Sequence, residues 1–308
     1  MPQPALVPAA PPEAVHAPPP VDAALMVVAL AAVSTSGPLI AATAAPALAI
    51  AFWRNAMASG VLVPWSLARG ALRGLEGRER RLIALAGALL AAHFATWVPS
   101  VTMTSVASAT ALVATQPIWA ALIARRQGAR VPTRAWVGIA VAVLGAAVVT
   151  GVDVTVSARA LAGDGLALAG AVFAASYVTA GGMARRTVST TAYTTVCYLV
   201  AALLLLVMAA AHRDALAGYP PEAWAKLAAL TVGAQLLGHS VFNRVLRTTS
   251  ATVVSVSILF EVPGAALIAG LWLGQRPPAG VWPGLVLLVT GVALVVTSRR
   301  TRSVASVQ

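Results

Sequence analysis

The sequence has little charge, a single lysine and a single cysteine. Charged residues make up 10% of its 308 residues, whereas soluble globular domains carry about 25%. Hydrophobic residues make up 59%, and the mean hydropathy is +0.85. The lone Cys197 excludes an intrachain disulfide and, within its apolar run, predicts an inert packed thiol. This composition excludes a soluble domain and predicts an integral membrane protein.

The chain also lacks the residue groupings that catalysis and cofactor binding require. Glu261 is the only carboxylate well inside an apolar stretch, so no catalytic carboxylate pair and no enzyme is expected. His93 and His239 are not spaced as a helical metal pair, which argues against a metal site. No nucleotide-binding motif is present, so neither direct ATP drive nor a bound cofactor is expected. The net charge of +12 comes from arginines placed mostly between apolar runs, which argues against nucleic-acid binding.

Apolar runs fill the sequence after a proline-rich start. Residues 1–20 contain eight prolines but neither an Arg or Lys nor a continuous apolar core, which argues against a signal peptide and predicts a disordered tail. Beyond this tail, apolar segments have the length of about 18 to 24 residues that a helix needs to cross ~30 Å of hydrocarbon. Ten such spans are predicted, at 22–43, 46–67, 82–102, 104–124, 133–151, 164–183, 191–211, 223–246, 249–273 and 279–297.

The basic residues in the connections predict an orientation, because Arg and Lys in short loops favour the cytoplasmic side. With the N-terminus inside, sixteen basic residues fall on the cytoplasmic side and four on the other, while Arg54 stays within a span. We therefore predict that both ends of the chain are cytoplasmic, with a basic tail over 299–308.

The two halves of the chain are copies of one another. An offset of 146 positions pairs uncommon residue types without a gap: His93 with His239, Pro117 with Pro263, Trp136 with Trp282, Gly138 with Gly284 and Gly145 with Gly291. Five spans separate equivalent positions, and because five is odd the second copy is predicted to be inverted. The expected fold is therefore all-α, with one five-helix repeat over 21–151 and an inverted one over 164–298. Inverted repeats place a substrate site near the membrane midplane, where the halves meet.

Short motifs follow one another along both halves. They are Ser34-Thr35-Ser36-Gly37-Pro38, Gln116-Pro117, Trp136-Val137-Gly138, Gly163-Asp164-Gly165 and Glu261-Val262-Pro263. In order and spacing they resemble the EamA-type family of the drug/metabolite transporter superfamily, over nearly the whole chain after the tail. The resemblance implies a ten-helix carrier of the inner (cytoplasmic) membrane, commonly an exporter of amino acids, related metabolites or drugs. Where that family often has a Glu at the ends of spans four and nine, this chain has Ala129 and Gln275.

Two charged residues are predicted to lie inside the membrane. Arg54 and Glu261 fall at comparable depths, roughly 12 to 17 Å from the outer ends of their spans at 1.5 Å per residue. A charge at this depth is costly and is normally paired or placed beside water. One explanation is a structural ion pair between two helices. The other is that Arg54 holds a substrate carboxylate while Glu261 holds an ammonium group or a coupling proton.

Five further residues complete the predicted substrate or coupling site. His93 and His239 are related by the repeat, and an imidazole can relay protons or bind a substrate. Trp97 and Tyr177 lie within spans and are candidates to line the route, although lipid-facing packing is the default for such residues. Thr115 occupies in the first repeat the position of Glu261 in the second.

The leading hypothesis from the sequence is a secondary transporter that works by alternating access and exports amino acids or related small metabolites, proton-linked or facilitated. Its partners are then a small-molecule substrate and the lipid bilayer. Efflux of cationic lipophilic drugs is the second hypothesis, with Glu261 as the counter-charge. A non-transporting structural membrane protein is the alternative of another class, and the intramembrane charges argue against it.

Overall fold

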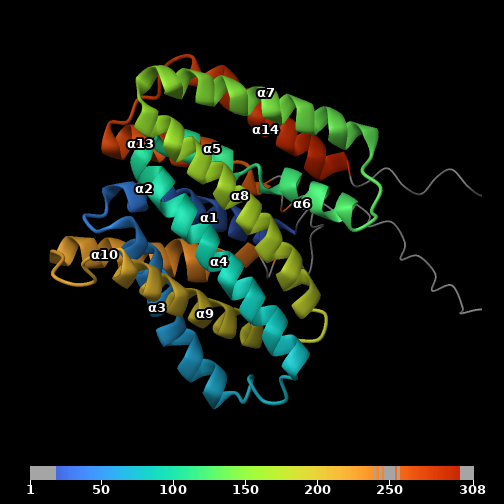
Figure 1. Ribbon diagram of the computed structural model, residues 1–308, viewed down its shortest axis with the longest axis vertical. Helices are drawn as coiled ribbons and strands as arrows, with labels where there is room; N and C mark the ends of the chain where they lie inside the picture. Colours follow the sequence, from blue (N-terminus) through green and yellow to red (C-terminus); the bar gives the residue numbers. More distant parts are fainter. Residues whose placement is uncertain (1–18, 239–240, 243–244, 246–253, 255–256, 299–308) are drawn as a thin grey trace, which may run out of the picture.

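The computed structural model describes residues 19–238, 241–242, 245, 254 and 257–298, which form helices joined by turns, without a strand in that part of the chain (Figure 1). The helices are α1 (Pro20–Ser34), α2 (Ser36–Ala42), α3 (Ala47–Ala68), α4 (Gly77–Met103), α5 (Val106–Val113), α6 (Gln116–Arg126), α7 (Thr133–Val156), α8 (Ala158–Ala184), α9 (Thr190–Ala211), α10 (Pro221–Ala229), the π-helix η1 (Leu230–Gly238), α13 (Glu261–Leu273) and α14 (Val281–Ser298).

Most of the predicted spans coincide with long helical segments. Within the described residues, eight segments are long and apolar enough to cross a membrane, and they correspond to predicted spans one to seven and ten. The helices α10 and η1 belong to predicted span eight, and α13 to predicted span nine. Much of the remainder of those two spans, including His239, lies outside the described residues. Large apolar side chains such as Leu203 and Val207 in α9 and Leu271 in α13 are exposed, as lipid contact requires.

The helices α7 and α14 lie side by side along one edge of the molecule (Figure 1). Glycines at repeat-related positions let their backbones touch: a Cβ at Gly138 would lie 2.6 Å from the carbonyl oxygen of Gly291, and one at Gly145 would lie 2.7 Å from that of Gly284. Small residues at such a seam allow the close packing that holds helices together in lipid. The glycines that revealed the repeat in the sequence therefore join its two copies.

Three predicted spans contain a break beside a proline. The first span divides into α1 and α2 at Thr35, three residues before Pro38. The fourth divides into α5 and α6 at Ala114 and Thr115, just before Pro117. The turn before α13 precedes Pro263, the repeat partner of Pro117. Because proline has no N–H, the carbonyl four residues earlier loses its helical hydrogen bond, which favours a break at that point. The helices α3 and α4, in contrast, continue through Pro64 and Pro99.

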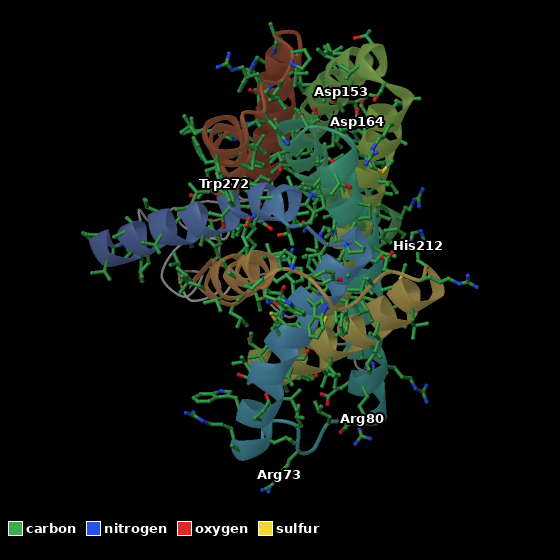
Figure 2. All side chains as sticks on the ribbon, turned by 90° about the vertical axis from the view of Figure 1, so that its left-hand side faces the viewer. Arg73, Arg80, Asp153, Asp164, His212 and Trp272 are labelled. Carbon is green, nitrogen blue, oxygen red and sulfur yellow. The ribbon has the colours of Figure 1, made fainter. Side chains whose placement is uncertain are left out.

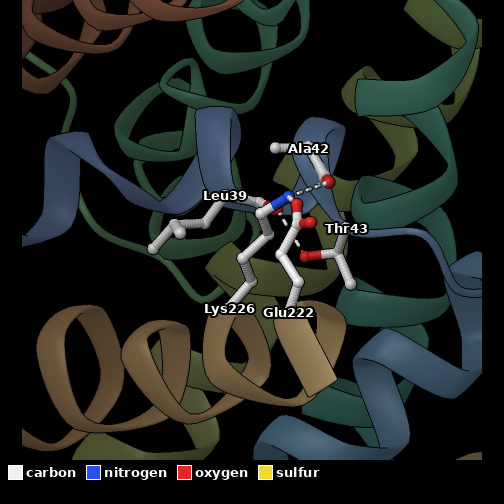
Figure 3. A network of polar contacts seen from close by, with 5 residues as sticks. All are labelled: Leu39, Ala42, Thr43, Glu222 and Lys226. Atoms are coloured by element: carbon white, nitrogen blue, oxygen red, sulfur yellow. Dashed lines mark hydrogen bonds and ion pairs between the residues drawn. The ribbon is translucent and has the colours of Figure 1, made fainter. Parts of the chain in front are cut away.

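A polar contact fastens α10 to the end of α2 (Figure 3). The Lys226 ammonium donates a hydrogen bond to the Ala42 carbonyl at 2.9 Å and pairs with Glu222 one turn earlier in α10. The Thr43 hydroxyl caps the same end of α2 by donating to the Leu39 carbonyl at 2.6 Å. This contact joins the first half of the chain to the second, on the opposite side of the molecule from the α8–α9 connection (Figure 1).

Candidate functional site

A cavity of about 400 Å³ lies between helices of the two repeats, within the range of small-molecule sites. Its wall combines α1, α3, α4, α5 and α6 with α8, α9, η1 and α13. The breaks before α6 and α13 bring Pro117 and Glu261 into this wall. Arg185 and Thr190, which flank the α8–α9 connection, also line the cavity and are exposed. The cavity therefore reaches the protein surface at that connection.

Arg54 is held in the cavity wall by a chain of hydrogen bonds. It is 2% exposed, and its Nε donates to the Gln235 side-chain oxygen of η1 at 2.8 Å. The Gln235 amide nitrogen donates to the Asn55 side-chain oxygen at 3.3 Å, and the Asn55 amide donates to the Ala51 carbonyl at 2.8 Å. The Arg54 guanidinium also lies over the Phe94 ring, 4.3 Å from its centre. These contacts fix the guanidinium in the cavity wall and leave its Nη1 without a hydrogen-bond partner among the described residues.

Glu261 lines the same cavity from the first position of α13. An acidic residue is favoured there because the N-terminus of a helix carries a partial positive charge. Within the described part of the chain, atoms of opposite charge come within 4 Å only in the pairs His212–Asp214 and Lys226–Glu222. Arg54 and Glu261 thus face one cavity without forming the direct ion pair that was one explanation from the sequence.

Three buried side chains in the wall end in polar atoms that find no hydrogen-bond partner among the described residues. They are Nη1 of Arg54, Nε1 of Trp97 and Oγ1 of Thr110, in α3, α4 and α5. Their residues are 2%, 5% and 2% exposed. A buried polar group left unpaired costs about 1–3 kcal/mol, so such atoms in a cavity wall indicate where a bound molecule or water completes the bonding.

Aromatic rings form much of the remaining wall. The His93 Nδ1–H donates to the Gly170 carbonyl at 2.9 Å, since a carbonyl can only accept, and the His93 ring stacks on Trp97 with 5.7 Å between ring centres. Tyr177 stacks on Tyr193 at 6.4 Å. These rings belong to the cavity lining, so Trp97 and Tyr177 face the interior of the protein rather than lipid.

Thr115 is not among the described residues of this lining. The Thr115 hydroxyl donates to the Leu112 carbonyl at 2.7 Å and accepts from the Trp119 indole at 3.2 Å. The break at Ala114 ends the continuous helix on which Thr115 was predicted to occupy the position equivalent to Glu261, and the Thr115 hydroxyl instead bonds to residues of α5 and α6. His239 lies outside the described residues.

Sequence reasoning missed several lining residues. Thr110 carried no signal beyond that of a small polar residue in an apolar span. Gln235 was recognisable only as a polar residue in a span, whereas its partner Arg54 lies 181 positions away. Tyr193 carried no signal beyond its position in an apolar segment.

A second buried polar cluster lies apart from this cavity. Asp153 and Asp164 are 4% and 0% exposed, and Figure 2 shows them close together at one end of the molecule. The Thr104 hydroxyl donates to Asp153 at 3.2 Å, and the Thr150 side chain is a further polar neighbour of Asp164. None of these four residues lines the cavity between the repeats.

Comparison with known proteins gives one family and a fold. The model of the EamA-like transporter family matches residues 22–151 and 161–297, one match for each repeat. No curated protein matches the chain. Among solved structures, a crystal structure described only as that of a protein superposes with a TM-score of 0.63 at 17% identity, over 92% of this chain and 99% of the other. At this identity the superposition supports the fold alone.

Proposed function

We propose, from the premise that the chain belongs to the EamA-like transporter family, that it is a secondary carrier exporting amino acids or related small metabolites. We further propose that it lies in the inner (cytoplasmic) membrane with both ends in the cytoplasm. In this proposal the cavity between the repeats opens to each side of the membrane in turn.

One observation carries the choice of substrate: Arg54 and Glu261 line one cavity and do not pair with each other. A charged side chain in a membrane protein needs a partner of opposite charge or water. A zwitterion brings a carboxylate for Arg54 and an ammonium group for Glu261, so it compensates both charges at once. A neutral solute compensates neither, and a simple cation only one.

The position of the cavity mouth fits the step in which an exporter loads its substrate. The mouth lies beside the α8–α9 connection, which the distribution of arginines assigns to the cytoplasmic side. In this conformation the cavity takes up substrate from the cytoplasm. Glu261 then exchanges the substrate's ammonium group for a proton after release on the far side, which is how we propose that export is linked to protons.

Reconstituted protein tests the proposal. Proteoliposomes should show saturable exchange of a radiolabelled amino-acid mixture, and both Arg54→Ala and Glu261→Gln should lower the initial rate at least about tenfold, since each removes one charge partner of the substrate. Ser59→Ala, which changes a buried residue outside the lining of the cavity, is the matched control and should transport normally. Unsaturable flux in the wild-type protein would instead favour the structural role.

Efflux of lipophilic cations is the second candidate, because several aromatic residues line the same cavity as Glu261. Cations over aromatic faces gain electrostatic attraction. The two candidates differ in their need for Arg54: export of ethidium should survive Arg54→Ala and be lost in Glu261→Gln. Amino-acid export should be lost in both variants.

A further inference from the structure

We propose that Nη1 of Arg54, Nε1 of Trp97 and Oγ1 of Thr110 form a subsite for a carboxylate group of the transported molecule, and that Gln235 positions Arg54 for this purpose. This inference rests on the proposed transport function and names the chemical group that one part of the cavity takes.

The hydrogen-bonding capacity of the three atoms determines what they can bind. The guanidinium and indole N–H groups can only donate, and a hydroxyl can rotate to donate as well. All three atoms are buried and have no partner among the described residues, and the residues that carry them line one cavity. A molecule that accepts from all three must therefore present several acceptor lone pairs, as the two oxygens of a carboxylate do.

The charge of Arg54 selects an ionised group over a neutral one. Its guanidinium is 2% exposed, and no carboxylate in the described ranges lies within 4 Å of it. A neutral amide would satisfy some of the donors but leave the guanidinium without an anion within 4 Å. Arg185 at the mouth is exposed, and away from the mouth the described wall carries one arginine, Arg54, and one carboxylate, Glu261. A second negative charge on the ligand would therefore meet no further cation there, which favours a monoanionic carboxylate over a phosphate dianion.

Gln235 restricts how Arg54 can bind. Its side-chain oxygen accepts from Nε of Arg54 at 2.8 Å, so the outer edge of the guanidinium remains for the ligand. Gln235 comes from η1 in the second repeat, and π-helical turns are frequent at functional sites. Arg54 comes from α3 in the first repeat. The subsite is thus complete only while the two repeats meet as they do here, which links carboxylate binding to the relative position of the halves.

A matched set of probes tests the subsite on the purified full-length protein. The probes are L-leucine, L-leucinamide, 3-methylbutylamine, which lacks the carboxyl group, and 4-methylpentanoate, which lacks the amine. A second set is built on L-serine with serinamide, ethanolamine and 3-hydroxypropanoate. Titration calorimetry should give an affinity for the amino acid at least about tenfold higher than for its amide or amine, because a hydrogen-bonded charge is lost in those probes.

Two conservative variants remove single donors. Thr110→Val and Trp97→Phe should each weaken binding of the amino acid and the carboxylate-only probe about tenfold. Binding of the amine should change less than about twofold, and the amide should weaken less than the acid. Ser59→Ala removes another hydroxyl that is buried and has no partner among the described residues, but does not line the cavity. It should leave all affinities unchanged.

The positioning role of Gln235 is tested by the ratio of the affinities for acid and amide, which the loss of a purely structural contact would not change. Gln235→Glu places a carboxylate against Nε of Arg54 and compensates its charge, so the preference for acid over amide should fall to near one while the amide still binds. Equal weakening of acid and amide in Thr110→Val and Trp97→Phe would overturn the subsite and leave the transport proposal standing. Failure of the wild-type protein to bind any probe of either set would contradict amino-acid transport itself.

Discussion

Gly181 shows how closely single residues are fitted at the cavity wall. A Cβ at Gly181 would meet the Tyr193 hydroxyl and would lie 2.8 Å from the ring carbon that carries it. Tyr193 lines the cavity, stacks on Tyr177 and has Arg185 beside its ring at 5.6 Å. The absence of a side chain at Gly181 is therefore what allows Tyr193 to lie in the wall.

Gly181→Ala should displace the Tyr193 ring, lower the melting temperature and reduce transport. Overpacking of this kind costs about 1–3 kcal/mol, and Tyr193→Phe in the same chain should recover part of the loss because it removes the atom in closest contact. The neighbouring Gly182→Ala is the control, since a Cβ there has no described atom within 4 Å. Equal melting temperatures for Gly181→Ala and Gly182→Ala would contradict this account.

At the scale of elements, α7 and α14 depend on backbone contact. A Cβ at Gly145 would meet the Leu288 backbone nitrogen in α14, whereas one at Gly151, six residues later in α7, would meet no described atom within 4 Å. The same substitution in one helix should therefore have opposite effects at the two positions.

Gly145→Ala should separate α7 from α14 and destabilise the protein by at least about 1–3 kcal/mol. Gly151→Ala should be neutral or slightly stabilising, because alanine favours a helix over glycine by roughly 0.5–1 kcal/mol. Melting curves of both variants in the same detergent make the comparison. A Gly145→Ala protein as stable as wild type would mean that the helices do not meet at this seam.

The elements also show where sequence reasoning was sufficient. Runs of about twenty apolar residues predicted the long helices, because length and hydropathy alone decide whether a segment can cross a bilayer. The sequence did not predict the breaks at Thr35 and Ala114. Pro38 and Pro117 were recognised, but helices in membranes often continue through a proline. Whether the chain continues or breaks there depends on neighbours that satisfy the freed carbonyl.

At the scale of the whole molecule, the repeat determines where the cavity lies and the arginines predict which side its mouth faces. Ala129 lies in the α6–α7 connection and Ala217 in the α9–α10 connection, and both are exposed. With both ends of the chain in the cytoplasm, the first connection is cytoplasmic and the second is on the other side.

Cysteine labelling tests this orientation cleanly, because the single native Cys197 is fully buried and can be replaced by alanine. In intact cells a membrane-impermeant maleimide should label Ala217→Cys and spare Ala129→Cys. In inside-out vesicles the pattern should reverse. Labelling of Ala129→Cys in intact cells would contradict the predicted orientation and, with it, the assignment of the cavity mouth to the cytoplasm.

The sequence by itself determined that this is a helical membrane protein of two related halves, and it identified the family, because hydropathy, helix length and the offset of 146 positions are properties of the chain alone. Only the tertiary structure decided which polar groups meet. It placed Arg54 on Gln235 and beside a cavity shared with Glu261, left the buried donors of Trp97 and Thr110, two residues of the cavity wall, without a partner among the described residues, and bonded Thr115 to the Leu112 carbonyl. The physical reason is that burial and hydrogen bonding depend on contacts between distant segments and on where helices break, and neither is local to the sequence.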